Sequence, residues 1–351
     1  MIPDVPDVPD VELATGALRI FRNVPSSIPL DPWPLFLTPI SPDKATPMTR
    51  LPSRLLALGQ ELDLSPTGFG FLQETHPLQG MDALRQQMTQ DGYLYLRDFW
   101  SRDAVQAVRD SLTRQLDQLG FLPAGSCLDE ARFNGREVGR AWGNPLNQHD
   151  PLLRQLLFGP RMHEFFSDFL GGEVSHFDFI WFRTKGPGLG SPIHCDLVYM
   201  GRGTHNLYTT WVPLGDVSLE LGGLLVLEGS HHQSDRLKAY LSRDVDEYCT
   251  NLPDADADAA EKKWWDGTLT RSPRSLQKSL GGRWLTSPEF RLGDVVIFNM
   301  QLVHGSLDNQ TDRFRLSTDT RFQLAAESID ERWVGENPPG HSLAQRRGRV
   351  C

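Results

Sequence analysis

The stretch that decides the fold is GDVVIFNMQLVHGS, residues 293–306. Gly293 and Asp294 are typical of a turn, the apolar run at 295–298 predicts a buried strand, and His304 follows near the end of that strand. Histidine is the commonest metal ligand in proteins. If His304 binds a metal, its partners must come from elsewhere in the chain.

Candidate partners lie upstream in SPIHCD, residues 191–196. Side chains alternate along a strand with a period of two, so we expect His194 and Asp196 to point the same way and Cys195 to point oppositely. Two imidazoles and one carboxylate form the triad that holds Fe(II) and leaves positions open for a co-substrate and dioxygen. The sequence therefore predicts a metal site made of His194, Asp196 and His304.

A candidate anion clamp follows in FRLSTDTRF, residues 314–322. Arg315 and Ser317 are two positions apart, so a strand places the guanidinium and the hydroxyl on one face. That pair is suited to bidentate binding of a carboxylate, as in a dicarboxylic co-substrate. Arg313 and Arg321 are the alternative clamps in this segment.

Short strand-like runs, separated by Gly, Pro and Asp turns, fill the chain from residue 176 onward. They predict an antiparallel jelly roll. The runs are HFDFIWFRTK (176–185), NLYTTWVPL (206–214), GGLLVLE (222–228), DVVIFNM (294–300) and RLSTDTRFQL (315–324).

Helices are predicted ahead of these strands. Ser101 is a suitable N-cap for a helix whose apolar residues recur at three- and four-residue steps and which ends at Gly120. Two more helices are predicted at 151–158 and 161–170. We expect them to pack against the sheet, which gives a mainly β fold with flanking helices, in the α+β class.

Four blocks of the chain, covering roughly residues 88–325, resemble the phytanoyl-CoA dioxygenase-like (PhyH) family of Fe(II)/2-oxoglutarate-dependent oxygenases. The resemblance implies a double-stranded β-helix, which is a cupin-like jelly roll. The blocks are DGYLYLRDFWSRDAV (91–105), SPIHCD (191–196), TTWVPLGDVSLELGGLLVLEGSHH (209–232), and GDVVIFNMQLVHGSLDN (293–309) with the FRLS that follows it.

The same resemblance implies roles for individual residues. His194, Asp196 and His304 look like the iron ligands, and Arg315 looks like the clamp for the C5 carboxylate of 2-oxoglutarate. The family usually has Pro-Gly-Ser-His where this chain has Glu-Gly-Ser-His at 228–231. That departure changes a turn and leaves the predicted metal site intact.

Two further residues look like co-substrate contacts by this resemblance, and each has a simpler interpretation. Trp211 either contacts the co-substrate or belongs to the core of the sheet. Ser306, two residues after the distal histidine, either contacts the co-substrate or closes a turn after Gly305. Ser317 joins the co-substrate site through its predicted strand face with Arg315.

The activity implied by the family is oxidation of a small organic molecule, most simply hydroxylation. It uses Fe(II), 2-oxoglutarate and O2, and it converts 2-oxoglutarate to succinate. Two other classes stay open: a non-redox metal-dependent enzyme on a cupin-type scaffold, and a catalytically silent ligand-binding protein. Substrate identity, desaturation or cyclisation in place of hydroxylation, and the oligomeric state are also open.

Composition restricts the classes of partner. The chain has 351 residues, 39% of them hydrophobic and 23% charged, with a formal net charge of −10. That acidic balance argues against broad binding of nucleic acid or anionic membranes, so a small-molecule partner is expected. No secretory signal or apolar run of ~18 residues is visible, and we expect a cytoplasmic protein. The four cysteines have no metal-binding spacing and predict free thiols.

The predicted organisation has three parts. Residues 1–65 form a Pro-rich arm without chemistry, 66–334 the oxygenase domain, and 335–351 a polar tail. A polar insertion at about 234–288 interrupts the domain and is a candidate lid for substrate selection. Its Trp264 and Trp265 either anchor the loop or cover a substrate.

Two more pairs of residues are ambiguous. Arg183 and Lys185 share a predicted strand face, where they either meet an anionic group at the site mouth or are solvated strand-end charges. His231 and His232 are adjacent, and adjacent strand residues face opposite sides, so we interpret them as structural.

Overall fold

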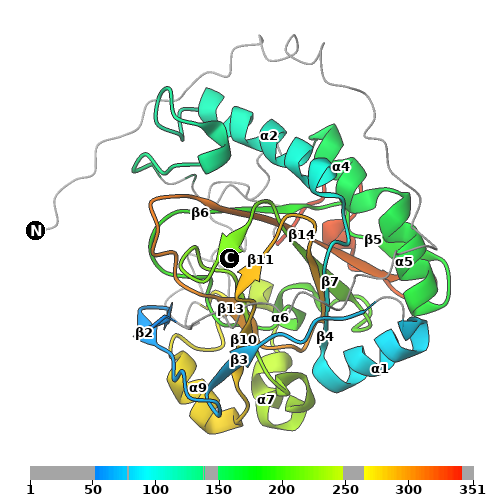
Figure 1. The fold of residues 1–351 in the computed structure, drawn as a ribbon. Helices are drawn as coiled ribbons and strands as arrows, with labels where there is room; N and C mark the ends of the chain where they lie inside the picture. Colours follow the sequence, from blue (N-terminus) through cyan, green and yellow to red (C-terminus); the bar gives the residue numbers. More distant parts are fainter. Residues whose placement is uncertain (1–51, 77–78, 137, 139–148, 248–264, 342–351) are drawn as a thin grey trace, which may run out of the picture.

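The computed structural model describes residues 52–76, 79–136, 138, 149–247 and 265–341. Its largest element is a six-stranded antiparallel sheet in the order β4-β12-β7-β14-β5, with β6 also pairing with β14 (Figure 1). The strands are β4 (Tyr93–Leu96), β5 (Val174–His176), β6 (Trp181–Lys185), β7 (Tyr208–Pro213), β12 (Val295–Asn299) and β14 (Arg315–Leu324).

A second sheet has four strands in the order β13-β9-β10-β3, in which only β10 and β3 pair in parallel. Two two-stranded sheets complete the β structure of the described residues. The strands of the four-stranded sheet are β3 (Phe69–Phe71), β9 (Leu224–Leu227), β10 (Trp284–Thr286) and β13 (His304–Ser306), and the short pairs are β1 (Leu56–Ala57) with β2 (Gln60–Glu61), and β8 (Val217–Ser218) with β11 (Glu289–Phe290).

Apolar side chains from both sheets form one shared cluster, so the sheets pack face to face. This arrangement confirms the predicted jelly roll, a double-stranded β-helix with flanking helices. The cluster contains Tyr93, Tyr95, Trp211, Val296 and Phe298 from the larger sheet, and Leu224, Val226 and Leu285 from the smaller one.

Helices cover the outer faces of the sheets (Figure 1). Those that pack on the larger sheet are α1 (Met81–Asp91), α2 (Arg102–Gln118), α4 (Pro151–Phe158) and α5 (Pro160–Leu170), and those on the smaller sheet are α7 (Ser234–Leu241) and α9 (Pro273–Leu280). The predicted helices α2, α4 and α5 are confirmed. Ser101 caps α2 by accepting a hydrogen bond from the amide of Ala104.

Alternation along β14 divides its side chains between two environments. Leu316 and Phe322 point to the helical layer and join its apolar core. The alternate residues are polar, and their cross-strand partners lie on the same face of the sheet. Ser317 is opposite Arg183, Asp319 is opposite Trp211 and Trp181, and Arg321 is opposite Thr209. The inner face of the larger sheet is therefore polar at this point, where an ordinary jelly roll would be apolar.

The metal-ligand segments differ from their predicted structure in two ways. His194 forms only an isolated bridge, and Asp196 precedes the short helix α6 (Leu197–Met200) with a helical backbone. The predicted shared strand face of His194 and Asp196 is therefore wrong. His304 follows the strand at 295–298, as predicted, but the chain first turns after β12, and His304 begins a separate strand, β13, in the other sheet.

Parts of the predicted arm, insertion and tail lie outside the described residues, and the three-part division stays a prediction. Within the described ranges, Leu55 and Ala57 are buried in the core, β10 of the insertion is a strand of the smaller sheet, and His341 is buried. Among the described residues, no helix has the length and apolarity needed to cross a membrane. Cys127 and Cys195 are free thiols, as predicted.

Candidate metal centre

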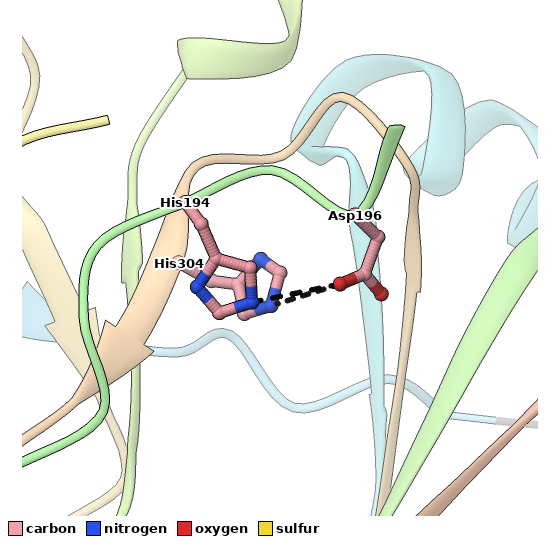
Figure 2. Close-up of side chains that lie close together, drawn as sticks. All are labelled: His194, Asp196 and His304. Atoms are coloured by element: carbon pink, nitrogen blue, oxygen red, sulfur yellow. Dashed lines mark ion pairs between the residues drawn. The ribbon is translucent and has the colours of Figure 1, made fainter. Parts of the chain in front are cut away.

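Three predicted ligands from two separate segments converge between the sheets. The Nε2 atoms of His194 and His304 each lie 3.6 Å from Oδ1 of Asp196, and the three ligand atoms are within 4.8 Å of one another (Figure 2). Atoms that each bind a common ion at about 2 Å lie at most about 4 Å apart. The 3.6 Å distances therefore fit ligation of a single metal ion.

The main chain holds the two histidines side by side. The amide of His194 donates to the carbonyl of His304, and the amide of His304 donates back, both at 2.9 Å. Gly305 allows this approach, because a Cβ atom there would lie 2.8 Å from Ile193 and 2.9 Å from the carbonyl oxygen of Ser191. The bridge places the two imidazole rings with their centroids 4.2 Å apart.

Backbone carbonyls select the tautomer of both rings. Nδ1 of His194 lies 2.7 Å from the oxygen of Pro192, and Nδ1 of His304 lies 2.9 Å from the oxygen of Leu302. A carbonyl oxygen only accepts, so each Nδ1 carries the proton and each Nε2 presents a lone pair toward Asp196. Burial, followed by the charge of His194, lowers the pKa of His304 to about 4. Neutral imidazole is the form that binds metal.

Asp196 uses its two oxygens differently. Oδ2 accepts hydrogen bonds from the hydroxyl of Thr209 and from Nη2 of Arg321, the latter at 3.0 Å. Burial by itself raises the pKa of Asp196, but Arg321 and then His304 outweigh it and hold the pKa well below its usual value. Asp196 is therefore an anion that can offer one oxygen, Oδ1, to a metal ion.

A pocket of about 410 Å³ opens beside the three ligands. It is lined by Arg183, Ser191, His194, Thr209, Trp211, Leu224, Phe298, His304, Gly305, Ser306, Arg315, Asp319 and Arg321. Trp211 and Ser306 thus line the pocket, as a co-substrate contact must. Ser317 is not among the lining residues.

Arg315 is a buried cation at this pocket, with 2% of the residue exposed. Its Nη1 donates to Oγ of Ser317 at 2.5 Å, which confirms the predicted pairing, while its Nε has no partner within the described structure. Burial, and next the charge of Arg183, lowers the pKa of Arg315 to about 9. A buried guanidinium without an anion is costly, so the site fits the carboxylate of a bound ligand.

The two alternative clamps have other partners. Arg321 is bound by the carboxylates of Asp319 and Asp196 at 2.6 and 3.0 Å. The charged group of Arg313 is half-exposed and lies 4.0 Å from Asp312, and Arg313 does not line the pocket.

Charges alternate along the polar inner face. Arg183 donates two hydrogen bonds to Asp319, Asp319 also binds Arg321, and Arg321 binds Asp196. The guanidinium of Arg321 also lies over the ring of Trp181, 3.9 Å from its centroid. Sequence analysis missed the roles of Thr209, Asp319 and Arg321. The sequence signal that could have identified the β14 residues was the polar residue at every second position of this strand.

The other ambiguous residues lie away from the metal centre. Trp265 packs against Tyr240 and donates to the carbonyl of Thr268, which favours anchoring, and Trp264 lies outside the described residues. His231 and His232 occupy a 3-10 turn with ring centroids 3.8 Å apart, so their predicted opposite faces are wrong. In the described part of the chain, His194, Asp196 and His304 form the only group of three or more candidate ligands with metal-binding spacing.

Comparison with known proteins gives a consistent set of matches. The family model of phytanoyl-CoA dioxygenase (PhyH) matches residues 88–317. Two relatives are named 1-deoxypentalenic acid 11-beta-hydroxylase, one from Streptomyces exfoliatus at 26% identity and one from Streptomyces arenae at 24%, each alignment covering 71% of this chain and 83% of the relative. The crystal structure of EctD from S. alaskensis with 2-oxoglutarate and 5-hydroxyectoine aligns with a TM-score of 0.49 at 17% identity, over 86% of this chain and 94% of that one.

Proposed function

The chain belongs to the phytanoyl-CoA dioxygenase family of Fe(II)/2-oxoglutarate-dependent oxygenases, and we propose that it hydroxylates a small organic molecule at the centre formed by His194, Asp196 and His304. The observation that carries this proposal is the common approach of two Nε2 atoms to one oxygen of Asp196. This donor set is the 2-His-1-carboxylate triad of non-haem Fe(II) oxygenases.

The protein prepares these ligands before metal binds. The carbonyls of Pro192 and Leu302 fix both imidazoles in the ligating tautomer, and Thr209 and Arg321 hold the second oxygen of Asp196. Three protein ligands on one side leave the opposite positions free. Bound Fe(II) supplies the activation of dioxygen, coupled to decarboxylation of 2-oxoglutarate to succinate.

Arg315 is our candidate for the residue that orients 2-oxoglutarate. Its unpartnered Nε and its burial beside the pocket suit a bidentate bond to the C5 carboxylate. Ser317 orients the guanidinium through its hydrogen bond to Nη1. Trp211 and Ser306 line the same pocket and are proposed to contact the co-substrate.

The relatives support hydroxylation as the reaction, since both carry the name of a hydroxylase that acts on a small acid. The apolar part of the pocket, made by Trp211, Leu224 and Phe298, excludes water from one side of the site. The guanidinium of Arg315, which has no carboxylate partner and an unbonded Nε among the described residues, also favours an oxygenase over a non-redox enzyme, because the latter has no need of a dicarboxylic co-substrate.

The test is formation of succinate from 2-oxoglutarate by protein purified without metal and then supplied with Fe(II) under air. We expect turnover that requires both Fe(II) and dioxygen and that His194→Ala abolishes. His205→Ala is the matched control, because His205 is exposed and, among the described residues, its side chain bonds to the carbonyl of Gly201 alone. Equal succinate formation by wild type and His194→Ala, or activity that persists without dioxygen, would contradict the proposal.

A further inference from the structure

We propose that the substrate is a small monocarboxylic acid with an apolar body and that Arg183 binds its carboxylate. This inference rests on the function proposed above and specifies the substrate class of the same site. It is based on the net charge of the side chains around the pocket.

Among the described residues, the pocket and its proposed metal ligands contain three cations and two anions. The cations are the guanidinium groups of Arg183, Arg315 and Arg321, and the anions are Asp196 and Asp319. Histidine binds a metal as neutral imidazole, so the two proposed histidine ligands add no charge once metal is bound. The protein therefore contributes a net charge of +1 to the pocket. This net charge does not change when Fe(II) and 2-oxoglutarate bind together, because their charges of +2 and −2 cancel. A positive charge without a counter-anion in a partly buried pocket is unfavourable, so a substrate with a single negative charge completes the site.

Arg183 is the guanidinium that can receive this charge. Arg321 is bound by two carboxylates, and Arg315 is assigned to the co-substrate. The side chain of Arg183 is 31% exposed, whereas that of Arg321 is 2% exposed. Its bonds to Asp319 use Nε and Nη2, so Nη1 is left outside that pair.

Asp319 does not neutralise Arg183 completely, because it is shared. Its Oδ2 accepts from Nη2 of Arg183 at 3.1 Å and from Nη1 of Arg321 at 2.6 Å. Arg321 is needed there to hold Asp196. The carboxylate of Asp319 is thus shared by the guanidinium groups of Arg183 and Arg321. Arg183, the more exposed of the two, therefore retains positive charge that is not balanced by Asp319.

The surroundings of Arg183 define the rest of the substrate. Arg183 lies on β6 opposite Ser317 of β14, next to the level of Arg315, so an acid bound there would lie beside the co-substrate. Trp211, Leu224 and Phe298 line the same pocket and offer contact to an apolar body. A carboxylate on a compact hydrocarbon frame satisfies both features.

The experiment compares acids with their uncharged amides by isothermal titration calorimetry. The protein is loaded with Mn(II) and 2-oxoglutarate in the absence of dioxygen, and the probes are cyclohexane- and adamantane-carboxylates and the corresponding carboxamides. We expect wild type to bind at least one acid about tenfold or more tightly than its amide, and Arg183→Gln to lose this preference. Lys185→Gln is the control, because Lys185 belongs to the same strand but does not line the pocket. Arg183→Lys, which keeps the charge, should retain part of the preference.

Two results would overturn the inference. One is a wild-type protein that binds no acid of the series more tightly than its amide. The other is an Arg183→Gln variant that keeps the preference for acids but binds 2-oxoglutarate more weakly, which would place Arg183 in the co-substrate site. Succinate formation without added substrate distinguishes failure of this inference from failure of the proposed function, since only the latter abolishes it.

Discussion

Nη2 of Arg321 lies 3.0 Å from Oδ2 of Asp196, although the two residues are 125 positions apart. The contact occupies the carboxylate oxygen that the imidazoles do not approach, and Thr209 donates to the same atom. Arg321 is itself fixed by Asp319 and by the ring of Trp181. The orientation of a proposed metal ligand therefore depends on β14, a strand that supplies none of the three proposed ligands.

Arg321→Gln should weaken Fe(II) binding. Loss of the guanidinium frees Oδ2 of Asp196 and removes the nearest positive charge that stabilises its anion. Residues that orient metal ligands typically contribute about 10–100-fold to metal affinity. Competition with a metal-binding dye under anaerobic conditions measures the change. Arg313→Gln should bind Fe(II) like wild type, because Arg313 lies outside the pocket. An Arg321→Gln variant of unchanged affinity would remove the positioning role.

Arg315→Met should stabilise the protein that lacks 2-oxoglutarate and weaken the binding of 2-oxoglutarate. Without co-substrate, the substitution replaces a buried cation that has no carboxylate partner in the described structure, so we expect the melting temperature to rise by about 2 °C or more. With 2-oxoglutarate the clamp is missing, and we expect its dissociation constant to rise about 30-fold or more. Differential scanning fluorimetry with and without 2-oxoglutarate measures both effects. A variant that is less stable when empty and equally stabilised by 2-oxoglutarate would assign Arg315 a structural role.

Local patterns predicted much of this fold. The helix that Ser101 caps, the two helices before residue 171 and the buried run at 295–298 all occur as expected, because caps and apolar periodicity are properties of neighbouring residues. The alternation of Arg315 and Ser317 correctly predicted a shared strand face.

Long-range contacts were less accessible from the sequence. His194 and Asp196 were expected to meet by sharing a strand, but the chain turns into α6 at Asp196, and the ligands meet through that turn and the bridge to His304. The role of Arg321 also depends on which strands are neighbours. Its partner across the sheet is Thr209, and no local pattern specifies that β7 pairs with β14.

Gly305→Ala should separate the two histidines. A methyl group at residue 305 would lie 2.9 Å from the carbonyl oxygen of Ser191 and 3.2 Å from that of Pro192, and neither backbone atom can rotate away. We expect loss of the bridge between His194 and His304, a lower melting temperature and at least about tenfold weaker Fe(II) binding. Gly172→Ala is a suitable control, since its closest contact is the flexible end of Leu324 at 3.2 Å. Equal Fe(II) affinity in the two variants would show that the bridge does not require glycine.

His176, which is not one of the proposed metal ligands, should make stability depend on pH. Its ring stacks on Phe158 at 4.1 Å between centroids, and burial lowers its pKa despite the opposing carbonyl of Phe177 and charge of Asp178. As pH falls, this histidine therefore becomes protonated near pH 6.5 in the unfolded chain, but only at a lower pH in the folded protein. The free energy of unfolding then falls as pH drops below about 6.5 and stops falling below the folded-state pKa.

His176→Phe keeps the stacked ring without the titrating group, so it should lose less stability than wild type between pH 7.5 and 5.5. Urea unfolding of the metal-free proteins at several pH values measures the difference, and the comparison cancels the titration of the metal ligands. His205→Phe is the control, because His205 is exposed and its variant should follow the wild-type pH dependence. If the free energy of unfolding of all three proteins falls in parallel with pH, burial of His176 does not cause the loss of stability at low pH.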